Sequence, residues 1–226
     1  MHTSRTPAPL RRALLASAAL LAAASPAAFA QAPAYPSKPI TIVVGYPPGG
    51  STDLTGRAVG AELSNRLGVP VVIENIGGAG GAIGAQKVAS AQPDGYTLLV
   101  GASNEIAINK LVTKEVKYDI KDFTAIGLVA SQPLVLVASP ASGVKNAADF
   151  IQLVSKNPGK YSYGSSGVGT SLHLAGEMLK SQGNLFMTHI PYRGVAPLTN
   201  DLVGNNLEFG VFVLSSGLPH IKSGKV

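Results

Sequence analysis

The chain has 226 residues, 46% of them hydrophobic and 13% charged, so it can bury a substantial core. It contains no cysteine, which excludes disulfides, thiol catalysis and cysteine-ligated metal sites. Its 18 Lys and Arg residues exceed its 12 Asp and Glu residues by six, but the basic residues are scattered along the chain. Nucleic-acid binding needs a concentrated basic face, so we predict no nucleic-acid partner.

The first thirty residues predict a signal peptide, 1–30. Three arginines precede an apolar run, 13–24, and Ala28-Phe29-Ala30 supplies the small residues typical of a cleavage site. The apolar run is shorter than the ~20 residues that span a bilayer, which argues against a membrane anchor. We therefore expect export to the periplasm. The mature part keeps 15 basic residues against 12 acidic ones, a surplus of +3 that suits an anionic ligand.

Strand-like and helix-like segments alternate after residue 40, which is typical of α/β proteins with largely parallel sheets. In chain order the pattern predicts strand 40–44, helix 54–67, strand 69–73, helix 82–90, strand 96–100 and a short helix after Asn104. It continues with strands 123–129 and 134–138, helix 146–157, a strand from Tyr161, helix 171–181, strand 186–190, helix 196–203 and strand 207–214.

Turns rich in glycine, serine and threonine follow three of the predicted strands, at 45–53, 101–104 and 164–170. Ligands of open parallel sheets bind at the carboxyl ends of the strands, where such turns meet. The first N–H groups of each following helix have no partner within the helix, and with the helix dipole they favour an anion. The sequence therefore predicts a site for a small anion.

Each motif also has a plainer interpretation. The turn at 45–53 lacks the lysine of a phosphate loop, and it fits either a ligand loop or a tight turn capped by Asp53. Gly164-Ser165-Ser166-Gly167 does not have the spacing of a hydrolase nucleophile turn. His173 and His189 have no near carboxylate at ligand spacing, so we predict structural histidines, no metal and no cofactor. Arg193 fits either a two-pronged carboxylate clamp or a surface charge.

An ordered set of motifs resembles the Bug-type solute receptors of tripartite tricarboxylate transporters. The set comprises 39–53, Val71-Val72-Ile73-Glu74-Asn75, 93–99, 163–167, Leu174-Ala175-Gly176-Glu177, 189–194 and 218–222. These motifs cover essentially the whole mature chain in order.

The resemblance implies a periplasmic-binding-protein fold (type II-like) with two lobes, each a parallel-rich sheet flanked by helices, that closes on one small carboxylate. It implies a first lobe at 31–133 and a second at 134–226. It also implies integral membrane transporter subunits as partners, and no catalysis. Such receptors hold one carboxylate through the turn matching 46–53, while the second lobe contributes the turns matching 165–170 and 192–194.

The predicted ligand-binding residues combine these turns with the helix starts. They are Tyr46, Gly49, Gly50, Ser51, Thr52, Asp53, Ser103, Asn104, Ser165, Ser166, Gly167, Gly169, Thr170, His173, Tyr192, Arg193 and Gly194.

Two departures from the resemblance matter. Phe212-Val213 stands where the family commonly has Phe-Asp, which removes a carboxylate that would hold an amino or hydroxyl group. Family members also continue beyond the position of Val226, so we expect an incomplete first lobe, and a monomer if the protein is complete. Two other functions stay open: a ligand sensor for a membrane signalling protein, and an α/β hydrolase.

Overall fold

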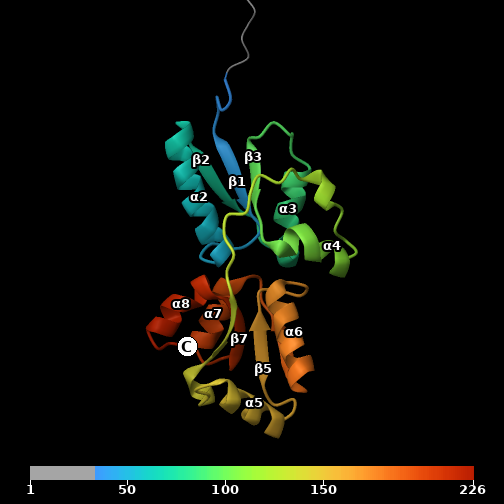
Figure 1. The fold of residues 1–226 in the computed structure, drawn as a ribbon, viewed down its shortest axis with the longest axis vertical. Helices are drawn as coiled ribbons and strands as arrows, with labels where there is room; N and C mark the ends of the chain where they lie inside the picture. Colours follow the sequence, from blue (N-terminus) through green and yellow to red (C-terminus); the bar gives the residue numbers. More distant parts are fainter. Residues whose placement is uncertain (1–33) are drawn as a thin grey trace, which may run out of the picture. The chain divides into compact units, whose positions relative to one another are not determined.

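The computed structural model describes residues 34–226, and the predicted signal peptide lies outside this range. Residues 36–226 form one unit that contains two separate β-sheets (Figure 1). Each of the two predicted lobes, 31–133 and 134–226, contains one of these sheets, and the lobe boundary itself stays a prediction. Within the described range, no helix has the length and hydrophobicity needed to cross a membrane.

The first sheet has three parallel strands, with β1 (Ile40–Val44) between β2 (Val71–Asn75) and β3 (Thr97–Val100). Helix α2 (Ser51–Leu67) follows β1 and helix α3 (Ala82–Ala89) follows β2, so both crossovers return the chain to a parallel strand.

The two helices cover opposite faces of this sheet. Ile42 and Val44 of β1 pack in a cluster with Val59 and Leu63 of α2. Leu99 of β3 lies in a different cluster, built around two alanines of α3 and Tyr118. Neighbouring residues of a strand face opposite sides, so this alternation buries both faces of the sheet.

Short elements fill the rest of the first half. They are η1 (Ala79–Gly81), the π-helical turn η2 (Asn104–Ile108), α4 (Asn109–Val112) and η3 (Ile120–Asp122).

The second sheet has the strand order β4-β7-β5-β6. Its strands are β4 (Leu134–Ala138), β5 (Ser162–Ser165), β6 (Thr188–Pro191) and β7 (Phe209–Val213). β5 runs parallel to β6 and β7, whereas β4 pairs antiparallel with β7. The predicted parallel-rich sheets are therefore present in both halves.

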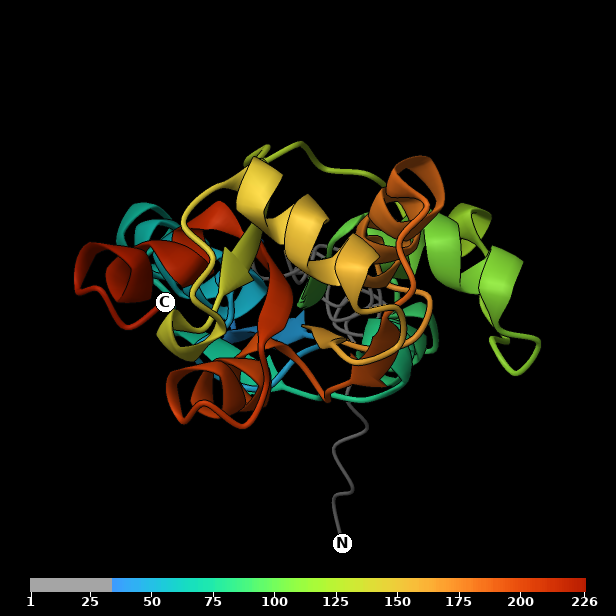
Figure 2. The same ribbon diagram turned by 90° about the horizontal axis from the view of Figure 1, so that it is seen from below.

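Helices again cover both faces of the second sheet. They are η4 (Pro140–Ser142), α5 (Ala147–Lys156), α6 (Ser171–Gly183), α7 (Val195–Val203) and α8 (Leu214–Lys222). In Figure 2, α5 (yellow) and α6 (orange) lie on one side of β7, and the red helices α7 and α8 lie on the other.

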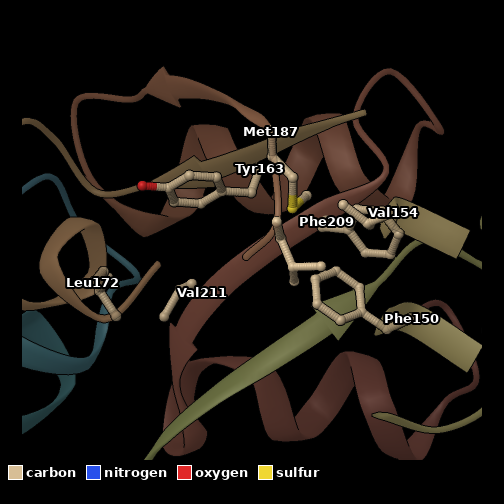
Figure 3. Close-up of a cluster of buried hydrophobic side chains, with 8 residues drawn as sticks. Phe150, Val154, Tyr163, Leu172, Met187, Phe209 and Val211 are labelled. Carbon is tan, nitrogen blue, oxygen red and sulfur yellow. The ribbon is translucent and has the colours of Figure 1, made fainter. Parts of the chain in front are cut away.

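The largest buried cluster joins α5 and α6 to this sheet (Figure 3). Phe150 of α5 meets Phe209 of β7 edge to face, with ring centroids 4.9 Å apart. This geometry is a favoured one for aromatic pairs, which contribute beyond their buried area. On the opposite face, Leu198 and Leu202 of α7 are fully buried beside Phe212.

Most predicted elements are present, with boundaries shifted by up to two or three residues, but one prediction was wrong. Residues 123–129 form no strand: their backbone pairs with no other strand, and Ile126 and Leu128 are 82% and 87% exposed. Helix α8 was not predicted, because Ser215-Ser216-Gly217 and Pro219 have the composition of a loop.

Candidate functional site

A cavity lies where the carboxyl ends of strands from both sheets meet. It is lined by Tyr46, Gly50, Ser51, Thr52, Ala102, Asn104, Ser166, Ser171, Leu172, Val195 and Val213. These residues end or follow β1, β3, β5, β6 and β7. The arrangement agrees with the rule that open α/β sheets bind ligands beyond the carboxyl ends of their strands.

The start of helix α2 supplies hydrogen-bond donors to this cavity. The N–H of Leu54 donates to the carbonyl of Gly50, which closes the first turn of the helix. Among the described residues, the N–H groups of Ser51, Thr52 and Asp53 have no partner. Three free donors at the positive end of a helix dipole form a surface that favours a carboxylate.

Asp53 holds this turn in place from behind. Its side chain is 2% exposed, and it accepts hydrogen bonds from the Gly49 N–H at 2.8 Å, from Arg57 and from Asn75. Burial opposes ionisation of this carboxyl, but these three hydrogen bonds more than offset it and lower the pKa of Asp53. Asn75 also donates to the carbonyl of Tyr46. Asp53 thus fixes the turn and does not border the cavity.

Asn104 connects the two halves of the site. Its Nδ2 donates to the hydroxyl of Tyr46, which donates in turn to the carbonyl of Gly80. Its Oδ1 accepts the N–H of Ser171, the first residue of α6, at 2.8 Å. Burial raises the pKa of Tyr46 well above its usual value, so the hydroxyl stays protonated. This chain of bonds orients groups from both sheets around the cavity.

Glu105 lies directly behind these groups and is 1% exposed. One carboxylate oxygen accepts the N–H of Ala102, and the other has no partner among the described residues. Burial raises the pKa of Glu105 to about 8, so this carboxyl is neutral at pH 7. Gly81 makes room for it, because a Cβ there would lie 2.6 Å from its Cδ.

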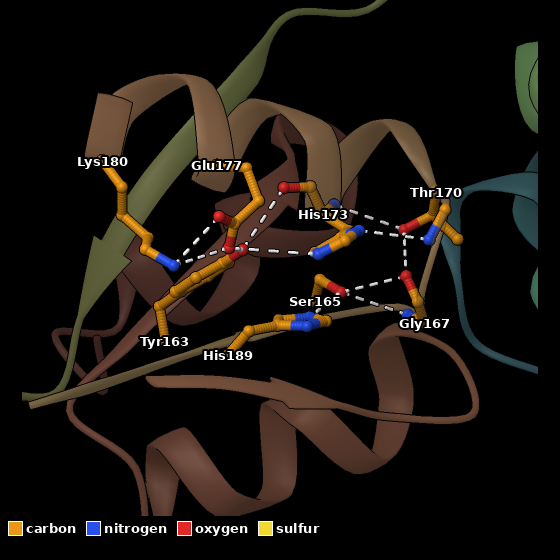
Figure 4. Close-up of polar contacts among 9 residues, drawn as sticks. Tyr163, Ser165, Gly167, Thr170, His173, Glu177, Lys180 and His189 are labelled. Carbon is orange, nitrogen blue, oxygen red and sulfur yellow. Dashed lines mark hydrogen bonds and ion pairs between the residues drawn. The ribbon is translucent and has the colours of Figure 1, made fainter. Parts of the chain in front are cut away.

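The turn after β5 is fixed by its own side chains (Figure 4). The carbonyl of Gly167 accepts from the hydroxyls of Ser165 at 3.2 Å and Thr170 at 2.7 Å. The N–H of Gly169 donates to Nδ1 of His173 at 3.1 Å. This turn leads into α6, so the bonds set the position of Ser171 and Leu172 at the cavity.

Two histidines stack beneath that turn, with ring centroids 4.1 Å apart. Nε2 of His189 lies 2.7 Å from the hydroxyl of Ser165, and Nε2 of His173 lies 3.9 Å from Glu177. Burial, reinforced by the charge of His173, lowers the pKa of His189 to about 4. Glu177 also accepts from Tyr163 and Lys180, so the cluster is internally satisfied (Figure 4). Among the described residues, no three His, Asp or Glu side chains are grouped so as to hold a metal.

The structure brings six of the seventeen predicted residues to the cavity: Tyr46, Gly50, Ser51, Thr52, Asn104 and Ser166. The other eleven do not line it: Gly49, Asp53, Ser103, Ser165, Gly167, Gly169, Thr170, His173, Tyr192, Arg193 and Gly194. Arg193 is exposed. Gly194, at φ 116°, lets its loop approach Pro47, since a Cβ there would lie 2.9 Å from the proline Cδ. Their direct contact with a ligand stays a prediction.

Five lining residues were missed by the sequence analysis: Ala102, Ser171, Leu172, Val195 and Val213. Ser171 and Val195 are the first residues of α6 and α7, so the rule that helix starts bind anions was a signal for both. The apolar residues carried no such signal, because the sequence does not show which valine or leucine faces a cavity.

Comparisons with known proteins give a consistent result. Residues 55–226 match the model of the tripartite tricarboxylate transporter family receptor. A UPF0065 protein from the tcbD-tcbE intergenic region of Pseudomonas sp. (strain P51) is 35% identical over 230 residues, which cover 100% of this chain and 68% of that protein.

Two solved structures are also similar. A structure described as a periplasmic transporter is 44% identical, with a TM-score of 0.83 over 85% of this chain and 65% of that one. Rpa4515 of R. palustris, solved with adipate, is 33% identical, with a TM-score of 0.83 over 84% of this chain and 64% of that one. The chain therefore spans about two thirds of the length of the proteins that it matches.

Proposed function

We propose that this chain, which belongs to the tripartite tricarboxylate transporter family of receptors, captures a small carboxylate and delivers it to a membrane transporter of that type. The likeness to the solved structures confirms the predicted α/β periplasmic-binding-protein fold. One solved neighbour is described as a periplasmic transporter, which supports export by the predicted signal peptide. Adipate in Rpa4515 supports a carboxylate as the ligand class.

One observation carries the proposal: Ser51 and Thr52, whose N–H groups at the start of α2 are free, line a cavity together with residues that follow strands of both sheets. A carboxylate there accepts hydrogen bonds from neutral donors, each worth about 1.5–3 kcal/mol when one partner is charged. The first residue of α6 and the hydroxyl of Ser166 border the same cavity, so groups from the second sheet contact the same ligand. We propose integral membrane subunits as partners, and a monomer for the complete protein.

The hydrolase alternative has one observation in its favour, the 2.7 Å contact between Ser165 and His189. However, Ser165 is fully buried and does not border the cavity. Its hydroxyl also donates to the carbonyl of Gly167, which supports a role in shaping the turn. We therefore infer binding without catalysis. A sensory role would use the same ligand site, and we propose transport because the matching family is one of transporter receptors.

Ser51 provides the test. Proline is well tolerated at the first position of a helix, and Gly50 already has the extended ψ of 169° that a following proline prefers. Ser51→Pro therefore removes one donor and keeps the helix, whereas Ser51→Ala keeps the N–H and removes only the hydroxyl. By calorimetry against a panel of small carboxylates, we expect Ser51→Pro to weaken binding at least tenfold and more than Ser51→Ala does. Equal affinities in two folded variants would refute this site.

A further inference from the structure

Glu105 is a buried carboxyl behind the candidate site that the proposed function does not use. It is 1% exposed and does not border the cavity, but it is attached to residues that do. Ala102, a lining residue, donates its N–H to Oε2 of Glu105 at 3.2 Å. Asn104, the preceding residue, lines the cavity and bonds to Tyr46 and Ser171. A change at this carboxyl therefore acts directly on groups that border the cavity.

The backbone of two glycines closes around the same carboxyl. A Cβ at Gly81 would lie 2.6 Å from its Cδ, and a Cβ at Gly45 would lie 3.0 Å from its Oε1. In the part of the chain that the structure describes, Oε1 has no hydrogen-bond partner. Residues 104–108 also form a π-helical turn, a conformation that is frequent at functional sites. Buried polar groups are normally hydrogen-bonded, so the free oxygen of Glu105 calls for a functional explanation.

No cation pairs with Glu105 among residues 34–226. The titratable groups that face it are Tyr46 and Tyr118, and the pKa of each is raised by burial first and also by the charge of Glu105. The lysines of the two helices that contact η2 are exposed and paired with other carboxylates, Lys87 of α3 with Glu74 and Lys110 of α4 with Asp119. Ionisation of Glu105 therefore leaves an unpaired negative charge in the interior, which is strongly unfavourable.

A ligand carboxylate in the cavity and an ionised Glu105 are two anions that share Ala102 and Asn104 as neighbours. Like charges repel more strongly where water is excluded than in bulk water. We propose that Glu105 is a positioning residue and a proton-linked switch of this site, which supports the capture of an anion as a neutral acid and opposes it as a carboxylate. The inference rests on the proposed function, because it needs an anionic ligand in this cavity.

Linkage fixes the sign of the effect. A ligand that favours the protonated form of Glu105 raises the pKa of this carboxyl, and protonation strengthens binding by the same factor. Below pH 7 the carboxyl is already neutral, so binding exchanges no proton with it. As the pH rises through the pKa of about 8, binding takes up a proton and the affinity falls.

The pH profile of binding tests the switch on the full chain. The probe is the tightest binder among adipate, malate, glutarate and pentanoate, whose carboxyls titrate near pH 4–5 and are ionised throughout. Glu105→Gln has nearly the same shape and stays neutral. By calorimetry, we expect the wild type and this variant to bind with similar affinity at pH 6.5, and the wild type to bind at least about threefold more weakly at pH 9. Other titrating groups are present in both proteins and cancel.

A constant ratio of the two affinities at every pH would overturn the inference, because Glu105 would then act through packing alone. If Glu105→Gln does not fold, Glu105→Met provides a second neutral side chain of similar length for the same comparison.

Proton uptake gives a test that needs no variant. At pH 8.5 the measured heat of binding should differ between Tris and triethanolamine, which have different ionisation enthalpies, and at pH 6.5 the uptake should disappear. A wild-type heat at pH 8.5 that shows no proton uptake would overturn the inference and leave carboxylate capture standing. Absence of binding by every acid of the panel at pH 6.5 would instead overturn the proposed function, and this inference with it.

Discussion

Asn104 accepts a hydrogen bond of 2.8 Å from the backbone N–H of Ser171, 67 positions further along the chain. The same side chain donates to the hydroxyl of Tyr46, so one buried amide satisfies groups that follow strands of two different sheets. The α2 turn, the π-helical turn and the start of α6 are thereby held in register around the cavity.

We expect Asn104→Leu, which has a similar volume, to destabilise the protein by about 1–3 kcal/mol, because the N–H of Ser171 loses its acceptor and the hydroxyl of Tyr46 keeps only its bond to the carbonyl of Gly80. It should also weaken carboxylate binding. Urea denaturation at pH 7 measures the first effect, and calorimetry measures the second. Asn200→Leu on the exposed side of α7 is the control, with an expected change below about 0.5 kcal/mol. Comparable stabilities of the two variants would mean that the bridge contributes nothing.

Asp53 and Glu62 offer a matched comparison on one helix, since each pairs with an arginine four residues later. Asp53 is buried and also holds Gly49 and Asn75, whereas Glu62 and Arg66 are both largely exposed. We expect Asp53→Asn to cost about 2 kcal/mol of unfolding free energy and to weaken ligand binding by loosening the turn. Glu62→Gln should cost at most about 0.5 kcal/mol. Denaturation curves for both variants decide the matter; a larger loss at Glu62 would contradict the assigned roles.

The periodicity of the sequence predicted the layers of this fold because apolar alternation directly reflects burial. Strand 40–44 agrees with β1 to the residue, and helix 171–181 begins where α6 begins. The prediction of a strand at 123–129 was wrong. A strand needs a neighbouring strand to pair with, which apolar composition alone does not reveal, and this segment pairs with none.

The candidate site was predictable only in part, for a related reason. Glycine and serine turns identified Gly50, Ser51 and Ser166, because their local conformation is encoded locally. The link between Asn104 and Ser171 depends on how distant segments pack, and so do the positions of Val195 and Val213 at the cavity. Asp53 fitted either a ligand residue or a cap of the turn; its carboxylate is bonded within the protein, which favours the second interpretation, and its contact with a ligand stays a prediction.

His189 predicts a loss of stability in mild acid. Its folded pKa is about 4, whereas a histidine in an unfolded chain titrates near pH 6.5. The unfolded state therefore binds the extra proton as the pH falls through this interval, so the contribution is complete above pH 6.5 and is lost towards pH 4. Burial is the main cause of this lowered pKa; the charges of His173 and Lys180 lower it further, and that of Glu177 opposes them.

Between pH 7.5 and pH 4.5, we expect the unfolding free energy of the wild type to fall by about 1 kcal/mol more than that of His189→Gln. This figure allows for the partial exposure of the ring. Urea denaturation at both pH values measures this difference. Carboxyls with lowered pKa values, such as Glu177, are present in both proteins and cancel in it. Parallel pH profiles would show that the histidine does not titrate in this range.

Glu105 predicts the opposite trend at higher pH. Its folded pKa of about 8 lies above the ordinary value of 4.5, so the unfolded state loses its proton first as the pH rises. The wild type should then lose up to about 1.4 kcal/mol per pH unit across that interval relative to Glu105→Gln, which stays neutral. Denaturation at pH 5 and pH 8 tests this. A constant difference between the two proteins would indicate that Glu105 is already ionised at pH 5.

Gly176 is required by the ring of Tyr163. A Cβ at Gly176 would lie 2.2 Å from Cε2 of that ring, which is 2% exposed and fixed by its hydrogen bond to Glu177. Gly60 of α2 is a matched helical glycine, but a Cβ there would meet the flexible end of Ile73 at 2.9 Å.

Replacing glycine by alanine favours the helix by about 1 kcal/mol at either position. The difference in stability between the two variants therefore reports the packing of the added methyl group. We expect Gly176→Ala to destabilise the protein by about 1–3 kcal/mol, because the ring and its bond to Glu177 must shift to relieve the overlap. Gly60→Ala should change stability by less than about 1 kcal/mol, because the end of Ile73 can rotate away. Urea midpoints at constant m-value provide the comparison. If Gly176→Ala proved as stable as Gly60→Ala, α6 would have room to move away from β5. The turn that carries Ser171 to the cavity would then be less rigid than its hydrogen bonds indicate.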